Sequence, residues 1–490
     1  MKKYIAAIDL GTTKIVTIIG EKLPSGKIHV LAHCEAPSQG VSRGEVDNPK
    51  EVVNIVTPAI EEIKRTTGLE FSDVYVGVAG QHVRCIENRF DVLREDYYKE
   101  IGEDEIRKLE ENMYHVRLNP GEEVLHVIPQ SYNIDDKQGV MRPVGMLGRK
   151  LEANFKVFVG RSTSIEHTKL AVQRMNLGLN RIVLEPIASA RAVLHEDEKE
   201  MGVVLVDIGG GTTDMVVYYD KIVRHTAVIP FGGDIITEDI RKGCGILPHQ
   251  AEQLKVQYGS CYSDLAVDNK IIAIPGICGR EPREVSFKVL AQIIEARMEE
   301  IIEAVMFEIE RSGYADKLHA GIVVTGGGAN LEHLPEYVKY KTGLDVHRGK
   351  PLYVSADSSD EVVHCAYATA VGLLLKGFDY EEEKERQRQI EEAEAVLIEV
   401  EEEIKVEEKE KKHKGGIFGG LFGVIDTGRS EQKQVNQEKI VDVKPPAPPK
   451  PPKPPKPPKP PKPPKPATRA IIDNSLFDGF FIDKKIDNRI

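Results

Sequence analysis

The sequence predicts an α/β protein of two related halves around a nucleotide cleft, and two observations lead to this fold class. An apolar run, an aspartate, a Gly/Thr turn and a second β-branched run occupy residues 5–19 and recur at 203–218. A further glycine turn, at 326–328, also follows an apolar strand directly. Such self-similarity indicates two copies of one motif, and glycine turns that share a ligand would place it between the copies.

The size and charge of the chain limit its function class. Its 490 residues exceed one ordinary domain, so the chain is long enough to hold a cleft between domains. The net charge of -12 argues against nucleic acid as a partner, because neutralising phosphates requires clustered Lys and Arg. The scattered cysteines form no metal-ligand pattern and indicate reduced thiols in a cytosolic protein.

The first glycine turn, in the segment DLGTTK, is typical of a phosphate-binding loop. Gly11 permits close backbone approach to an anion, and the hydroxyls of Thr12 and Thr13 add donors. A Walker or Rossmann motif would open a helix after its glycines, whereas a β-branched run follows here. A glycine-rich hairpin without any ligand is the alternative for a single turn.

The second turn, DIGGGTTD at 207–214, repeats this chemistry with three consecutive glycines. Asp9 and Asp207 end the first strands of the two hairpins, so we expect them to face each other across the cleft. Two carboxylates beside a polyphosphate suit Mg²⁺, which takes few protein ligands and keeps several waters. Alternatively, each aspartate caps its own turn through a side-chain bond to the backbone.

The three motifs DLGTTK, DIGGGTTD and VVTGGGAN resemble, in order, the phosphate 1, phosphate 2 and adenosine motifs of the actin-like ATPase superfamily. Within it, the stretches SQGVSRGEVDN, DVYVGVAGQHV, LEPIASARAVL and PFGGDIITEDI are similar to the FtsA family of bacterial division proteins. The resemblance runs from residue 5 to about residue 378. It implies an actin-like fold with a small inserted α+β subdomain, and ATP and Mg²⁺ as cofactors.

The resemblance also implies individual ligand contacts. Cofactor-binding residues would be Gly11, Thr12, Thr13, Lys14, Gly209, Gly210, Gly211, Thr212, Thr213, Gly232, Gly233, Gly326, Gly327, Gly328 and Asn330, with Asp9 and Asp207 at the metal.

Two further sites follow from the same resemblance. Glu252 and Lys255, three residues apart on an expected helix, would reach the ribose and base; an exposed pair within that helix is the alternative. Glu185 matches the position of a carboxylate that orients the attacking water in some relatives. The protein would be at most a slow ATPase.

A four-subdomain architecture is a further implication. Subdomain IA would comprise residues 1–83, 166–200 and 366–378, and the inserted subdomain 1C residues 84–165. Subdomain IIA would comprise 201–235 and 313–365, and IIB 236–312. Residues 379–490 would form a linker, a Pro/Lys-rich rod and a membrane-targeting tail.

FtsA proteins tether FtsZ filaments to the membrane, so the resemblance implies partners as well. The FtsZ carboxy-terminal peptide would dock on IIB, where Arg280, Arg283 and Arg297 could pair with its carboxylates. Arg297 could instead pair with a glutamate of its own helix. Self-association into filaments, recruitment of later division proteins and a peripheral location on the cytoplasmic face of the membrane at the division site are implied too.

The tail is expected to be disordered beyond residue 414. Residues 380–414 would form a linker that is either a solvated helix or disordered, and a coiled coil is the lesser alternative there. At 444–466 a lysine recurs every third residue over most of the run, which as polyproline II would extend roughly 70 Å with lysines along one edge. This rod is either an inert spacer or a cationic stripe for anionic lipid. We expect membrane contacts from the apolar patches beside it: Ile417, Phe418, Leu421, Phe422, Leu476, Phe477, Phe480 and Phe481.

Other members of the superfamily remain alternatives on sequence alone. A pilus-assembly scaffold would share the fold. A sugar-kinase-like ATPase would need an acidic catalytic residue over a small-molecule cleft, which the sequence does not identify, and would not need a lipid-seeking tail. A chaperone would need a substrate-binding domain where the proline-rich segment stands.

Overall fold

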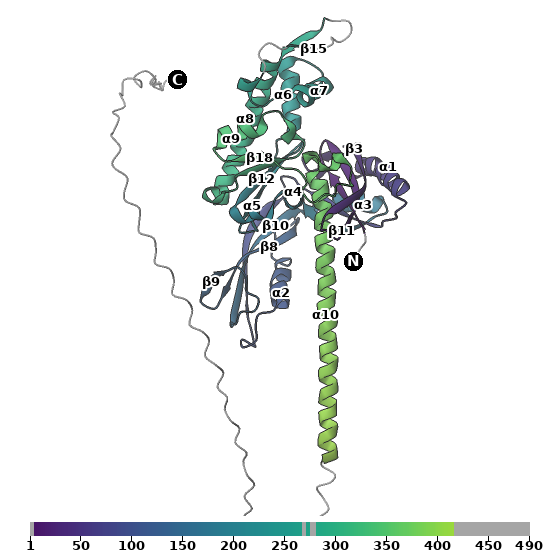
Figure 1. The fold of residues 1–490 in the computed structure, drawn as a ribbon, viewed down its shortest axis with the longest axis vertical. Coiled ribbons are helices and arrows are strands. Elements are labelled where there is room, and N and C mark those ends of the chain that lie inside the picture. The colour runs from purple at the N-terminus through teal and green to yellow at the C-terminus, as the bar shows by residue number, and fades with distance from the viewer. Residues whose placement is uncertain (1–3, 267–270, 275–280, 416–490) are drawn as a thin grey trace, which may run out of the picture. The chain divides into compact units, whose positions relative to one another are not determined.

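The computed structural model describes residues 4–266, 271–274 and 281–415, with the backbone alone for 394–415 (Figure 1). The tail residues predicted to contact the membrane, Ile417 to Phe422 and Leu476 to Phe481, lie outside these ranges, as does Arg280. Among the described residues, every helix is too short or too polar to span a lipid bilayer.

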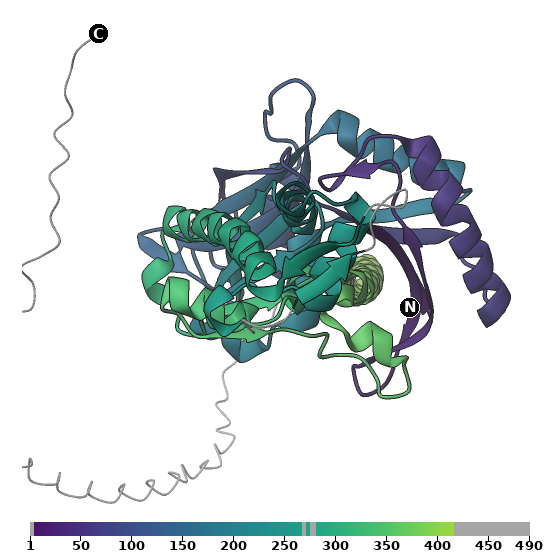
Figure 2. The same cartoon turned by 90° about the horizontal axis from the view of Figure 1, so that it is seen from above.

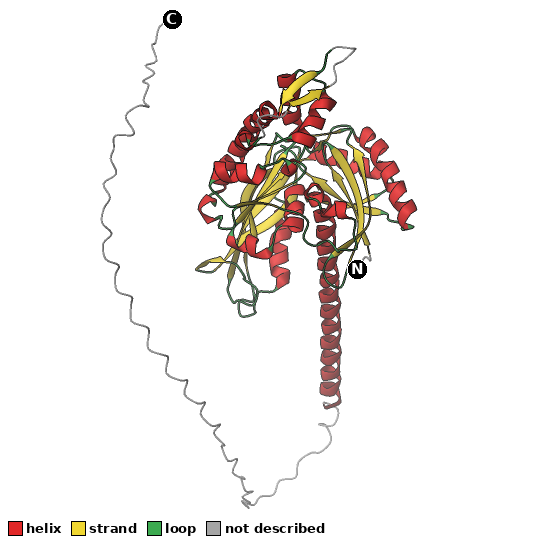
Figure 3. Ribbon diagram, turned by 45° about the horizontal axis from the view of Figure 1, so that its top comes forward, coloured by secondary structure: helices red, strands yellow, loops and turns green. Residues whose placement is uncertain are grey.

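Two five-stranded sheets of equivalent topology form the centre of the protein, drawn in yellow in Figure 3. The first has the order β11-β6-β1-β2-β3, and the second the order β14-β13-β12-β17-β18. In each sheet the first three strands in sequence pair in antiparallel fashion. Two later strands are added in parallel beside the first strand. The predicted pair of related halves is therefore confirmed.

The strand bounds show how closely the halves correspond. In the first sheet they are β1 Tyr4–Leu10, β2 Lys14–Lys22, β3 Ile28–Pro37, β6 Asp73–Val78 and β11 Gly178–Leu184. In the second they are β12 Val203–Ile208, β13 Thr213–Tyr219, β14 Ile222–Ile229, β17 Ile322–Thr325 and β18 Val346–Arg348. The central strands are almost entirely buried, because helices cover both faces, and this explains their continuous apolar sequence.

Helices α1 (Pro49–Thr67) and α3 (Ser162–Arg174) cover the outer face of the first sheet. Helix α1 buries Val52, Val56, Ile60 and Ile63 at helical spacing, and the Asn48 side chain caps its first turn. On the second sheet the corresponding cover comes from α6 (Gly233–Cys244), α7 (Pro248–Tyr258), α8 (Phe287–Ser312) and α9 (Leu334–Thr342).

Two helices lie between the sheets: α4 (Glu185–Val193) and the first part of the long α10 (Ala368–Gly415), residues 368–378. Figure 2 views α10 end-on beside the purple strands of the first sheet. The two helices cross where a β-carbon on Gly372 would overlap the carbonyl of Ala188, so only glycine permits this approach. One buried cluster combines these helices with Ile5 and Val16 of the first sheet and Leu205 and Val216 of the second.

An α+β unit is inserted between the first half's strands and has its own core. It contains β7 (Arg84–Leu93), α2 (Glu103–Met113), β8 (Glu122–Ile134), β9 (Lys137–Val140) and β10 (Lys150–Arg161), in the sheet order β7-β10-β8-β9. Helix α2 packs Leu109 and Met113 against Leu151 and Phe155 of β10. The boundaries given above for the four subdomains remain predictions.

The remaining α-helices and strands of the described residues are short. They are β4 (Val41–Ser42), β5 (Glu45–Val46), α5 (Glu196–Met201), β15 (Ile271–Ile274) and β16 (Arg283–Ser286). Helix α10 continues without a break through residue 379, so the helical form of the predicted linker is the one observed.

Candidate functional site

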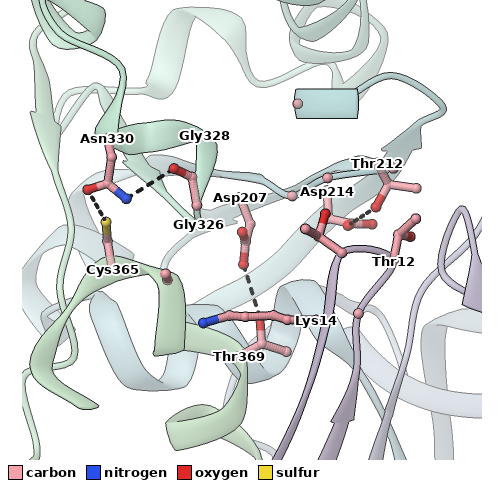
Figure 4. Close-up of a pocket in the computed structure, with 18 of the residues that line it drawn as sticks. Thr12, Lys14, Asp207, Thr212, Asp214, Gly326, Gly328, Asn330, Cys365 and Thr369 are labelled. Atoms are coloured by element: carbon pink, nitrogen blue, oxygen red, sulfur yellow. Dashed lines mark hydrogen bonds between the residues drawn. The ribbon is translucent and has the colours of Figure 1, made fainter. Parts of the chain in front are cut away.

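A cavity of about 300 Å³ lies where the three glycine turns meet. The turn after β1, the turn after β12 and the turn after β17 all line it, and Figure 4 shows Asp207 between Asn330 and Cys365 on one side and Thr12 and Thr212 on the other. Most of the predicted residues line this cavity: Asp9, Gly11, Thr12, Thr13, Lys14, Glu185, Asp207, Gly209, Gly210, Gly211, Thr212, Gly233, Glu252, Lys255, Gly326, Gly327, Gly328 and Asn330.

The two phosphate-type turns touch each other across the cavity. A β-carbon on Gly210 would overlap the Thr13 hydroxyl, and one on Gly211 would lie 2.6 Å from the Thr12 hydroxyl. The Thr13 hydroxyl also lies 3.5 Å from a carboxylate oxygen of Asp234. The glycines are therefore required by the contact between the two halves, in addition to any ligand.

The third turn approaches Asp207 just as closely. Gly326 has φ +87°, and a β-carbon there would overlap the Asp207 carboxylate and lie 2.6 Å from the Ile208 carbonyl oxygen. Both the conformation and the space demand glycine. Gly327, by contrast, has open space where a β-carbon would point.

Four carboxylates gather at the floor of the cavity. Burial and the neighbouring Asp207 raise the pKa of Asp9 to about 7, although Lys14 opposes the shift. Burial and Asp207 likewise raise the pKa of Asp214 to about 7. Burial, followed by the charges of Asp9, Asp214 and Asp207, raises the pKa of Glu185 well above its usual range. A cation would relieve this repulsion.

The oxygen donors available fit Mg²⁺. Glu185 Oε1 and Asp214 Oδ1 are buried and have no hydrogen-bond partner. In the part of the chain that the structure describes, no three His, Cys, Asp or Glu side chains form a metal site by themselves. Asp207 accepts hydrogen bonds from Ser189 (2.6 Å) and Thr369 (3.2 Å), on α4 and α10, rather than capping its own turn.

Lys14 is held beside the phosphate-type turns by Glu35 on β3 and by Tyr367, which directly precedes α10. Its Nζ lies 2.7 Å from Glu35 and 3.9 Å from the centroid of the Tyr367 ring. The Tyr367 hydroxyl donates to the same Glu35 carboxylate at 2.7 Å. Lys14 therefore presents a fixed positive charge at the cavity wall.

On the opposite side, Glu252 and Lys255 are both an intrahelical pair and part of the cavity wall. Lys255 Nζ lies 2.7 Å from Glu252 and donates to the Gly233 carbonyl and the Thr237 hydroxyl, each at 2.9 Å. Glu252 and Lys255 thus pair within their helix and also line the cavity, but the Lys255 side chain is only 12% exposed, so this is not the exposed pair of the alternative. Asn330 donates to the Gly327 carbonyl and accepts from the Cys365 thiol.

Two predicted residues lie off the cavity. Thr213 is fully buried in β13 and donates to the Phe231 carbonyl at 2.8 Å. A β-carbon on Gly232 would lie 2.6 Å or less from the Gly209 and Gly210 carbonyl oxygens, so this glycine supports the second turn from behind.

The cavity also contains residues that the sequence analysis did not select: Gly44, Asp214, Ile236, Val256, Leu331, Cys365, Ala366 and Thr369. Asp214 closes the DIGGGTTD motif and could have been chosen from its symmetry with Asp207. Thr369 gives no such signal, because it opens a helix far away in the sequence.

Two of the three candidate partner-binding arginines, Arg283 and Arg297, belong to the described residues, and both have partners there. Arg297 pairs with Asp239 on α6 at 2.7 Å and with Glu300 on its own helix, so the alternative of a structural ion pair is the arrangement observed. Arg283 is exposed and donates only one bond that the structure shows, to the Cys244 carbonyl at 2.9 Å.

His126, on β8 of the inserted unit, supports the start of α4. The backbone N–H of Leu184, which precedes Glu185, donates to His126 Nε2 at 3.3 Å. Burial lowers the pKa of His126 to about 3, and the nearby charges of Arg181 and Lys376 act in the same direction. The imidazole is therefore neutral in the folded protein.

This burial predicts a pH-dependent stability. The unfolded chain takes up a proton at His126 below about pH 6.5 while the folded chain does not, so the free energy of unfolding falls as the pH drops from there towards 3. Between pH 7 and pH 5 the contribution is about 2 kcal/mol. Denaturant unfolding should show that His126→Gln loses this part of the pH dependence, whereas the exposed control His115→Gln keeps it. Equal dependence in both variants would contradict the assignment.

Comparison with known proteins agrees with this geometry. The model of a family described as "Cell division protein FtsA" matches residues 204–372, and that of the "SHS2 domain inserted in FTSA" matches residues 80–159. The cell division protein FtsA of Pseudomonas aeruginosa is 36% identical over 375 residues, covering 76% of this chain and 89% of the relative. That of Escherichia coli K12 is 34% identical over 388 residues, covering 77% and 90%.

Among solved structures, the PilM-PilN type IV pilus biogenesis complex matches with a TM-score of 0.54 at 15% identity, covering 76% of this chain and 98% of that chain. At this identity the likeness concerns the fold alone. The fold is actin-like with an inserted SHS2 unit. The family is decided by the sequence relatives, because the match covers most of the length of each. The chain belongs to the FtsA family of cell division proteins.

Proposed function

We propose that this division protein binds Mg-ATP in the cavity between its halves, assembles into filaments at the cytoplasmic membrane, and there tethers FtsZ and recruits later division proteins. The observation that carries the nucleotide part is the convergence of three glycine turns and four buried carboxylates on one cavity. A polyphosphate bound beside them needs converging donors and a cation, and the site supplies positions for both.

Roles within the cavity follow from position. The turns at Gly11 and Gly209 to Gly211 would present backbone N–H groups to phosphate, and Lys14 would add charge. Asp9 and Asp207 would hold Mg²⁺ through its waters, and the ion would neutralise the phosphate oxygens. Glu185, whose Oε1 has no partner, would orient the attacking water in a slow hydrolysis.

The opposite end of the cavity suits a nucleoside. Ile236, Val256 and Leu331 provide apolar walls, and Gly327 has open space where a β-carbon would point. Glu252 and Lys255 would contact the ribose, with Asn330 at the adenosine. A few polar groups at fixed positions on an otherwise apolar wall are typical of a specific small-molecule site.

Tethering is supported by family membership and by the tail sequence. Attachment would be peripheral, through the apolar patches at 417–422 and 476–481 with the lysine rod as an electrostatic aid. For the FtsZ peptide, Arg283 is the better of the two described candidates, since the charge of Arg297 is neutralised by two carboxylates.

Co-sedimentation tests the tether. The full chain should pellet with anionic liposomes and carry FtsZ with it, and pelleting should weaken with salt and on neutral lipid because each lysine near an anionic surface contributes up to about 1 kcal/mol. A truncation ending at Lys414 should lose liposome binding and keep ATP affinity, since the cavity residues all precede it. Undiminished pelleting of the truncation would show that the tail is not the anchor.

A further inference from the structure

The loop between β3 and α1 connects the cavity to the inserted unit. Gly44, in this loop, lines the cavity, and its backbone N–H donates to the Thr12 hydroxyl at 3.4 Å. Thr12 belongs to the first phosphate-type turn. A displacement of that turn therefore reaches the loop directly.

The next residue, Glu45, contacts both chain segments that join the inserted unit to the first half. Residues 79–83 lead out to β7, and the chain returns where β10 ends at Arg161 and α3 begins. The Ser164 hydroxyl donates to Glu45 Oε2 at 2.6 Å, and Arg161 lies 3.7 Å from the same oxygen. His82 Nδ1 lies 2.9 Å from Glu45 Oε1, an ion-pair distance, although the two atoms are out of line for a hydrogen bond.

These contacts are enclosed and closely packed. The His82 side chain is only 1% exposed. A β-carbon on Gly44 (φ +77°) would lie 3.0 Å from Ala79, and one on Gly80 (φ +115°) would lie 2.9 Å from Glu45 Cγ. The loop and the outgoing segment therefore cannot slide past each other independently, because each occupies the space of the other's missing side chain.

The charge of Glu45 is maintained in this setting. Burial alone would raise its pKa, but the hydrogen bond from Ser164 and the proximity of His82 and Arg161 lower the pKa below its usual value. A charged carboxylate that faces partners on both connecting segments attracts them together.

We propose that Glu45 is a positioning residue that couples the phosphate end of the cavity to the orientation of the inserted unit. When a phosphate group engages Thr12, Gly44 moves with it, and Glu45 transmits the movement to His82 on one connection and to Ser164 on the other. The inference rests on the proposed binding of nucleotide. It assigns the inserted unit a nucleotide-dependent placement relative to the first half.

Hydrogen exchange measured by mass spectrometry on the full chain tests the coupling, with and without a non-hydrolysable ATP analogue and Mg²⁺. In the wild type, ligand should slow exchange in peptides covering 207–214, at the cavity, and in peptides covering 79–86 and 159–166, at the two connections. Glu45→Ala should keep the first response and lose the second. Glu45→Gln, which still accepts from Ser164, should retain part of it.

The matched control is Glu122→Ala. Glu122 pairs with Arg84 at 2.6 and 2.8 Å, beside the same connections but without any contact to the loop that the structure shows. This variant should keep both responses. If Glu45 had only a structural role, Glu45→Ala would change hydrogen exchange equally with and without the analogue. Should Glu45→Ala fail to fold, Ser164→Ala replaces it, with the same expected loss of the response at the connections.

The two proposals fail differently. Absence of protection at 207–214 in the wild type would overturn nucleotide binding at this cavity. Protection there without a response at 79–86 and 159–166 would overturn the coupling alone. A full response at the connections in Glu45→Ala would likewise exclude Glu45 as the positioning residue.

Discussion

Replacing Gly326 with alanine is expected to lower ATP affinity by at least about 100-fold, which corresponds to ~2.8 kcal/mol. The new methyl group would overlap the Asp207 carboxylate and lie 2.6 Å from the Ile208 carbonyl oxygen, at a backbone position with φ +87°. The turn and Asp207 cannot both keep their places, and the strained backbone adds roughly 1–3 kcal/mol. Titration calorimetry with Mg-ATP measures the affinity, and thermal unfolding measures the accompanying loss of stability.

Gly327→Ala is the matched control, because it adds the same methyl group one residue later. No atom lies within 4 Å of that position, and the residue does not have positive φ. Its unfolding free energy should stay within about 0.5 kcal/mol of the wild type. Wild-type affinity in Gly326→Ala would show that the third turn does not determine the shape of the site.

Glu185→Gln is expected to slow ATP hydrolysis by about 10²–10⁴-fold, the usual contribution of a positioned acid or base. The amide has the same shape but cannot accept a proton, and removing one of four crowded carboxylates should leave ATP affinity equal or higher. Single-turnover hydrolysis of labelled ATP separates the chemical step from binding.

Two results would count against this role. Unchanged hydrolysis in Glu185→Gln would remove Glu185 from the chemical step, and wild-type protein that binds ATP without any turnover would leave no step for it to assist. Thr237→Ala is a suitable control, since Thr237 donates to Glu252 at the far end of the cavity and does not line it.

The fold was largely predictable because its repeat is visible in the chain. The hairpins β1–β2 and β12–β13 carry the same order of apolar run, aspartate and glycine turn, and that order requires equivalent strands. The sequence could not show that α10 continues past residue 379, since its polar, charged composition favours a solvated helix and a disordered linker about equally.

Site residues that belong to a contiguous sequence motif could be predicted. Site residues that reach the cavity only through tertiary contacts could not. Asp207 and the glycines are visible in the sequence, but the hydroxyl of Thr369 reaches Asp207 only because α10 begins at the cavity. For the same reason the close approach of Gly210 to Thr13 could not be predicted, because the two residues lie nearly two hundred positions apart in the sequence. The charge of Arg297 is visible in the sequence, but its ion pair with Asp239 is not, because Asp239 lies on another helix.

The crossing of α4 and α10 has a consequence for how the halves are related as folding units. Side chains from both sheets pack on these two helices in one cluster, and Gly372 of α10 lies against Ala188 of α4 where the helices cross. Neither half can bury its inner face without the other, so the duplication visible in the sequence does not correspond to two independently stable domains. We therefore expect the halves to unfold together as one cooperative unit, and to move relative to each other by shear across the α4–α10 contact rather than by separation.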